Sequence, residues 1–154
     1  SAQLGSTTMK RFIAVVTIIL LMAPVTALSQ SDWNALITQS GATGYSVEGA
    51  TKIDVSTAKT MHESDAKFFD ARENWRWKLG HIPGAFSFNV VSETTLMELA
   101  DKTDNVVFYC GGTGCKLSAN ASAEAIIWGY ENVYYFAEGL PGWNTAGYAI
   151  EASE

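Results

Sequence analysis

The sequence is poor in histidine, proline and basic residues, and each shortage excludes a class of protein. Its two histidines, His62 and His81, are too few and too far apart to predict a metal site. Three prolines and 17% charged residues do not describe a disordered tail. Ten basic residues stand against sixteen acidic ones, a net charge of -6, so the chain is a poor nucleic-acid binder.

Apolar and aromatic residues are plentiful, and they predict a packed core. The chain has 154 residues, 47% of them hydrophobic, including five Trp, six Tyr and seven Phe. Internal repeats and low-complexity tracts are absent from the sequence. One globular domain accounts for this composition.

The N-terminal 27 residues have the pattern of an export signal. Ser1–Thr8 read as an artificial extension or a misassigned start, because Met9, Lys10 and Arg11 then form a basic opening. An apolar and threonine run follows over residues 12–23, and residues 24–27 end it with a proline and small residues suited to cleavage. Residues 9–27 are therefore a predicted secretory signal peptide.

The alternative is an uncleaved membrane anchor, but the apolar run is shorter than the roughly 20 residues that span a bilayer. Cleavage after Ala27 would leave eight basic and sixteen acidic residues, a net charge of -8. We expect an exported protein in a bacterial periplasm, touching the membrane only through residues 9–27 if they are retained. Residues 28–44 are then an N-terminal segment, and residues 45–152 are the folded domain.

Apolar runs and helical spacings alternate along the domain. This alternation predicts parallel βαβ units and an α/β fold. The expected strands are residues 52–55, 66–70, 85–88, 105–109 and 132–136, and the expected helices are residues 32–38, 56–63, 92–100, 117–128 and 140–146, with a loop over 39–44.

Chemistry gathers at the carboxyl ends of parallel strands. Asp70, Arg72 and Cys110 all lie at such ends. Cys110 also opens a loop that contains three glycines, lies between a buried strand and a helix, and ends at Lys116. Such a loop can turn its N–H groups inward, and the helix N-terminus adds further N–H groups, so an anion is favoured at its centre.

Cys110 is the predicted nucleophile, because inward N–H groups lower the pKa of a thiol and the thiolate is the reactive form. The same groups would stabilise a persulfide or an incoming oxyanion. A single buried cysteine after an apolar strand is usually structural, but a structural cysteine has no need of a glycine-rich cradle. The predicted substrate-binding residues are Gly111, Gly112, Thr113, Gly114, Cys115, Lys116 and Arg72, and no metal ligand is predicted.

Five segments of the chain resemble the rhodanese family in its order and approximate spacing. They span about residues 52–151, so the resemblance covers the whole predicted domain. The matching segments are Phe68–Glu73, Gly80–Ala85, Val106–Cys110, Gly129–Tyr134 and Glu138–Tyr148.

The resemblance implies a rhodanese-like three-layer sandwich, with a central, mainly parallel five-stranded sheet and helices on both faces. It implies a monomeric sulfurtransferase that takes a sulfane sulfur from thiosulfate or a related small sulfur-containing anion. The Cys110 thiolate would attack the outer sulfur, release sulfite and pass the sulfur to cyanide, a thiol or a protein acceptor. No metal or organic cofactor is implied.

The loop departs from the commonest family pattern, because Gly129 lies two residues further from Cys110 than in many relatives. Ser118 matches the family's serine, and Leu117 falls where the family has arginine, so Lys116 is left to supply any loop charge. The loop is similar to that of small exported rhodaneses with two cysteines in it. This departure affects which sulfur donor the loop would prefer more than which class of reaction it would catalyse.

Cys115 has three interpretations. It is a resolving thiol that attacks an oxidised or persulfidated Cys110, or a disulfide partner of Cys110 in an oxidising compartment, or a residue that only lines the loop. Asp70 and Arg72 are expected to brace the site, with Arg72 also a candidate for contact with substrate oxyanions. His81 is expected to order its turn rather than transfer a proton.

Two other functions remain open. A non-catalytic sulfur carrier would accept polysulfide and hand it to a partner enzyme through the same persulfide. A phosphatase-like or arsenate-reductase-like enzyme would use a Cys-x5-Arg loop on the same scaffold. Cys110 to Lys116 has that length, but lysine does not supply the bidentate fork of arginine.

Aryl phosphate hydrolysis separates the phosphatase alternative from the sulfurtransferase. We expect no release of the chromophore from a chromogenic aryl phosphate, because a lysine at position 116 holds a phosphate less specifically than arginine. Hydrolysis that disappears in Cys110→Ser would instead support the phosphatase.

Overall fold

The structure of the protein is a computed structural model that describes residues 32–39 and 44–154. The predicted signal peptide, residues 9–27, lies outside the described residues, as does the extension before it. Most of the predicted loop over residues 39–44 lies outside them too.

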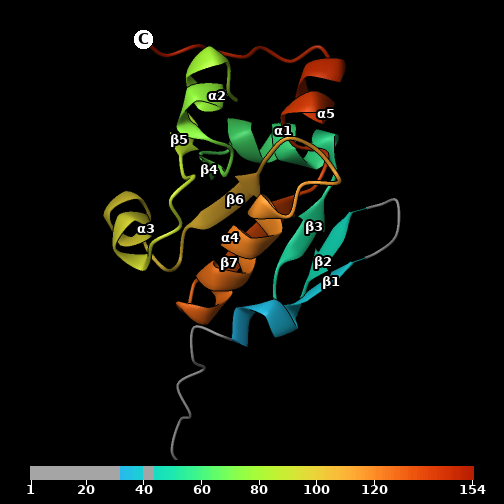
Figure 1. The fold of residues 1–154 in the computed structure, drawn as a ribbon. Helices are drawn as coiled ribbons and strands as arrows, with labels where there is room; N and C mark the ends of the chain where they lie inside the picture. The colour runs from blue at the N-terminus through green and yellow to red at the C-terminus, as the bar shows by residue number, and fades with distance from the viewer. Residues whose placement is uncertain (1–31, 40–43) are drawn as a thin grey trace, which may run out of the picture.

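A five-stranded parallel sheet forms the centre of the domain (Figure 1). Strand order along the sheet is β3-β7-β6-β4-β5, so the most apolar strand, β6, has a neighbour on each side. The strands are β3 (Thr51–Ile53), β4 (Lys67–Asp70), β5 (Phe86–Ser87), β6 (Asn105–Tyr109) and β7 (Asn132–Phe136). The predicted α/β class and the parallel five-stranded sheet are therefore confirmed.

Helices cover both faces of the sheet because β6 is apolar on both sides. Val106 and Phe108 pack on one face, toward α3 (Glu93–Leu99) and α4 (Leu117–Ile127). Val107 and Tyr109 pack on the other, toward α1 (Val55–Glu63) and α5 (Gly139–Thr145). The result is the predicted three-layer sandwich.

Helix α2 (Asn74–Leu79) was not predicted from the sequence. None of its six residues is buried, and Trp75 and Leu79, its apolar pair at helical spacing, are both exposed, so no core-facing stripe marks the helix. The segment after α5 crosses over α2 (Figure 1), where the backbone of His81 pairs with that of Glu151. This crossing holds α2 at the carboxyl edge of the sheet, beside the loop that follows β6.

The ends of the predicted elements differ from the structure at two places. The strand expected at residues 85–88 is reduced to the two residues of β5, which pairs only with β4 at the sheet edge. The helix expected at residues 32–38 is a 3-10 helix, η1 (Asp32–Leu36), followed by β1 (Ile37–Gln39), which pairs antiparallel with β2 (Tyr45–Val47). β-branched residues at 37 and 38 favour this change to extended backbone.

The described residues contain neither a membrane-spanning helix nor a cluster of metal ligands. Across residues 32–39 and 44–154, no helix has the length and apolar character needed to cross a bilayer. Within the same ranges, no group of three or more histidine, cysteine and acidic residues is placed to hold a metal ion.

Leu96 and Met97 provide a matched test of the core on α3. Leu96 is fully buried, whereas Met97 is 58% exposed. We expect Leu96→Ala to lower the free energy of unfolding by about 2–5 kcal/mol, because it leaves a cavity. Met97→Ala should change it by less than about 0.5 kcal/mol. Urea denaturation measures both, and equal losses would contradict this packing.

Candidate active site

Cys110 directly follows β6 and lies at the carboxyl edge of the sheet, as the sequence predicted. Its carbonyl oxygen accepts a hydrogen bond of 3.0 Å from the Leu140 N–H at the start of α5. Gly139 has a φ of +59°, and a Cβ at this position would collide with the Cys110 carbonyl. Only glycine combines this backbone conformation with so close an approach, so the loop is locked to α5.

Asp70 and Arg72 form a buried ion pair behind this edge. The Arg72 Nη2 lies 2.6 Å from Asp70 Oδ2 and 2.7 Å from the carbonyl oxygen of Gly80. Burial opposes the charge on Arg72, but the hydrogen bond and charge of Asp70 outweigh it and raise the pKa of the guanidinium. Arg72 therefore braces the turn before His81, and its fork is already occupied by Asp70.

Two sulfur atoms meet at the N-terminus of α4. The side chain of Cys110 is fully buried, whereas Cys115 is half-buried. The Cys110 thiol donates a hydrogen bond to the Cys115 carbonyl oxygen, 3.4 Å from its sulfur. The Ser118 hydroxyl donates to the Cys110 sulfur at 3.1 Å. The two cysteines are free thiols in this structure.

The contact between the sulfurs moves their pKa values apart. The hydrogen bond from Cys110 lowers the pKa of Cys115 to about 6, helped by the backbone N–H groups of Gly111 and Leu117. The same contact, followed by burial, raises the pKa of Cys110, against the lowering effect of Ser118. The pair thus shares one proton at neutral pH, with the negative charge on Cys115.

The amide cradle predicted from the glycine-rich loop is divided between the two sulfurs. We expected its N–H groups to face the Cys110 sulfur. The N–H groups of Gly111 and Leu117 interact with Cys115 instead, and that of Ser118 interacts with Cys110. The loop thus stabilises a thiolate at its centre, but the sulfur nearest the solvent is that of Cys115.

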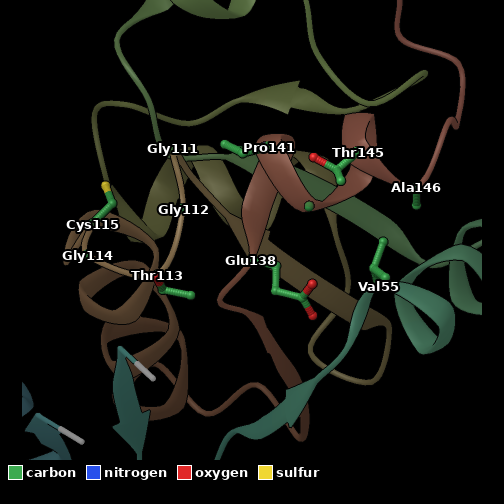
Figure 2. Close-up of a pocket in the computed structure, with 11 residues that line it drawn as sticks. Val55, Gly111, Gly112, Thr113, Gly114, Cys115, Glu138, Pro141, Thr145 and Ala146 are labelled. Carbon is green, nitrogen blue, oxygen red and sulfur yellow. The ribbon is translucent and has the colours of Figure 1, made fainter. Parts of the chain in front are cut away.

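A cavity of about 830 Å³ opens beside the loop (Figure 2). Gly111 to Cys115 form one wall, and residues along α5 from Glu138 to Ala146 form the wall opposite, with Val55 of α1 at the side. Cys110 is not among the lining residues. The loop residues predicted to bind substrate therefore lie together, except for the two basic ones.

Lys116 and Arg72 lie outside this cavity. The Lys116 ammonium is 3.4 Å from Asn34 Oδ1 and 5.9 Å from the centre of the Trp33 ring, so it points toward η1. Arg72 contributes to a second cavity of about 590 Å³, which shares Gly111 with the first. A small anion in this second cavity would meet Arg72 and Arg76, both of which line it.

Sequence analysis missed Glu138, whose side chain lines the first cavity between β7 and α5. Its position directly after a parallel strand was the available signal, because the carboxyl ends of all five strands share one edge. His81, by contrast, has the expected ordering role: Nδ1 lies 2.7 Å from the Trp77 carbonyl oxygen and Nε2 lies 3.1 Å from Glu151 Oε1.

The sequence that forms this architecture matches a known protein family. The family model of the rhodanese-like domain matches residues 54–146, which include β4, β6, the two-cysteine loop and most of α5. The chain belongs to the rhodanese-like family. The predicted resemblance is thereby confirmed, and the family is one of sulfurtransferases.

A curated relative and two solved structures show how similar this rhodanese is to known members. The thiosulfate sulfurtransferase GlpE of Haemophilus influenzae is 30% identical over 103 residues, covering 66% of this chain and 95% of GlpE. The Alr3790 protein of Anabaena sp. is 21% identical with a TM-score of 0.58, covering 66% and 92% of the two chains. The BH2092 protein of Bacillus halodurans is 22% identical with a TM-score of 0.59, covering 67% and 77%.

The proton shared by the two sulfurs yields a pH prediction. In the wild-type rhodanese, alkylation of Cys115 by iodoacetamide should rise with pH through a midpoint of about 6, since the thiolate is the reactive form. Cys110→Ala removes the hydrogen bond that lowers this pKa, so the midpoint should move up toward the ordinary value of 9.0. Peptide mass spectrometry identifies the alkylated cysteine, and an unchanged midpoint in Cys110→Ala would contradict the contact.

Proposed function

We propose that this rhodanese transfers a sulfane sulfur from thiosulfate, or a related donor, to a thiophilic acceptor through a persulfide on Cys110. The observation that carries the proposal is the placement of the Cys110 sulfur at the N-terminus of α4, 3.1 Å from the Ser118 hydroxyl and 3.4 Å from the Cys115 carbonyl oxygen. The acceptors that fit this chemistry are cyanide, a small thiol and a protein thiol.

Ser118 supports Cys110 as the sulfur that carries the persulfide. Its hydroxyl, 3.1 Å from the Cys110 sulfur, and its N–H both stabilise negative charge there. Proton exchange across the contact between the two sulfurs makes Cys110 the thiolate and Cys115 the thiol. The pair therefore supplies the nucleophile without a separate general base.

Access to Cys110 requires the loop to move. The Cys110 side chain is fully buried, and the segment from Gly111 to Gly114 lies between it and the first cavity. Three glycines in this segment give the backbone several low-energy conformations. We propose that the donor anion binds where the loop and Arg76 meet, near Gly111, and that the segment shifts to let the outer sulfur of the donor reach Cys110.

Thiosulfate is the first donor to test, because the curated relative GlpE is described as a thiosulfate sulfurtransferase. The charged side chains around the loop favour approach of the donor from the side of Arg76. Glu138 gives the first cavity a carboxylate, and lysine and arginine are absent from its lining as far as residues 32–39 and 44–154 form it. A divalent anion such as thiosulfate is repelled by that carboxylate and attracted by Arg76.

Sulfite release tests the proposed function. Reduced protein mixed with thiosulfate should release sulfite in proportion to the protein within the first turnover, and thiosulfate and cyanide added together with a reductant should give continuous thiocyanate formation. Cys110→Ser should lower both rates by on the order of 10³-fold or more, because the covalent route is lost. Cys115→Ser should keep the sulfite burst at a reduced rate.

The controls separate the proposal from its alternatives. If Cys110→Ser still releases sulfite and Cys115→Ser does not, the nucleophile is Cys115 and the assignment is wrong. A sulfite burst without thiocyanate formation in Cys115→Ser, which has no second thiol to close a disulfide, would indicate the sulfur carrier rather than the enzyme. Glu131→Gln, an exposed carboxylate remote from the loop, is a matched control and should behave as wild type.

A further inference from the structure

A second cysteine lies beside the sulfur that carries the persulfide in this rhodanese. A persulfide carrier needs one sulfur, and burial of Cys110 would suffice to protect it. Here the Cys110 sulfur lies 3.4 Å from the Cys115 carbonyl oxygen, and Cys115 also lines the cavity. These are the only two cysteines in the sequence. The arrangement places a persulfide on Cys110 next to a residue whose thiol is able to attack it.

We propose that the Cys110–Cys115 pair releases the transferred sulfur as hydrosulfide and closes to a disulfide. This is a second activity, reduction of bound sulfane sulfur, and it rests on the proposed function only for the loading step. Of the three interpretations of Cys115 that the sequence left open, the structure thus favours the resolving thiol, and it makes the disulfide that thiol's product.

The reaction balances within the pair. The Cys115 thiolate attacks the Cys110 sulfur of the Cys110–S–SH persulfide, and a bond forms between the two cysteine sulfurs. The bond from Cys110 to the outer sulfur breaks, and its electron pair leaves with that sulfur as hydrosulfide. The outer sulfur is reduced and the two cysteine sulfurs are oxidised, so no external oxidant is consumed.

A second turnover needs a reductant. A dithiol, either a small molecule or a protein of the thiol–disulfide oxidoreductase class, supplies two electrons and two protons to reopen the disulfide. Persulfide transfer to cyanide needs no such reductant. The two activities therefore compete for one persulfide, and the acceptor and dithiol concentrations decide between them.

Local geometry favours the internal attack. Cys115 already lies beside its target, with its carbonyl oxygen 3.4 Å from the Cys110 sulfur, so the step avoids the entropy cost of bringing an acceptor to a buried atom. The N–H groups of Gly111 and Leu117 hold Cys115 as a thiolate. Because Cys115 is half-buried and lines the edge of the cavity, hydrosulfide has an exit beside it. A persulfide formed on Cys115 instead, attacked by Cys110, gives the same products.

The test compares three forms of the full chain: wild type, Cys115→Ser and Cys110→Ser. Each is reduced, freed of reductant without air, and mixed with thiosulfate in the absence of cyanide. Intact mass and released hydrosulfide are then measured after an acid quench. A parallel sample without thiosulfate detects disulfide formed by stray oxygen.

The expected results differ between the forms. Wild type should release hydrosulfide in an amount equal to the protein, lose two hydrogen atoms and resist alkylation. Cys115→Ser should keep one extra sulfur atom and release at least tenfold less hydrosulfide, because its persulfide has no neighbour to attack it. Dithiothreitol should restore hydrosulfide release by wild type over many turnovers.

Two outcomes overturn the inference, and they are distinguishable. If wild type keeps the extra sulfur as stably as Cys115→Ser and its second thiol remains open to alkylation, the pair does not resolve persulfides, although the proposed function stands. If no form gains sulfur and wild type releases no hydrosulfide, the proposed function fails and the inference fails with it.

Discussion

Parallel pairing of β6 between β4 and β7 is the constraint on which the site depends. Tyr109, the last residue of β6, is in register with Asp70 of β4 and with Phe136 of β7. The residues that follow these strands must therefore meet at one edge. This register brings Cys110, Arg72 and Glu138 to that edge from three parts of the chain, and apolar packing on both faces of β6 fixes it.

At this edge of the sheet, burial decides which charged groups neutralise each other, and the overall composition of the chain does not. The buried pair of Asp70 and Arg72 neutralises itself, and losing either partner would leave an uncompensated charge, at a cost of about 3–5 kcal/mol. The remaining negative charge belongs to the sulfur pair, where backbone N–H groups stabilise it. A chain with a net charge of -6 thus holds a reactive anion, with backbone N–H groups beside it.

Much of the fold followed from the sequence because its signals are local. The apolar run of β6, the Ser92 cap of α3 and the glycines that end α4 and α5 each predict their element within a residue or two. The helix α2 escaped detection because it is exposed throughout. Strand β1 escaped because its pairing with β2 depends on residues beyond an intervening loop.

By itself, the sequence determined that a cysteine would follow the central strand and open a glycine-rich loop before a helix, since these are properties of neighbouring residues. Only the tertiary structure decided which sulfur faces solvent, where Lys116 points and that Glu138 enters the cavity. Those outcomes depend on how the loop packs against α5 and η1. A hydrogen bond between two sulfurs is likewise a matter of their distance and orientation, which spacing along the chain leaves undetermined.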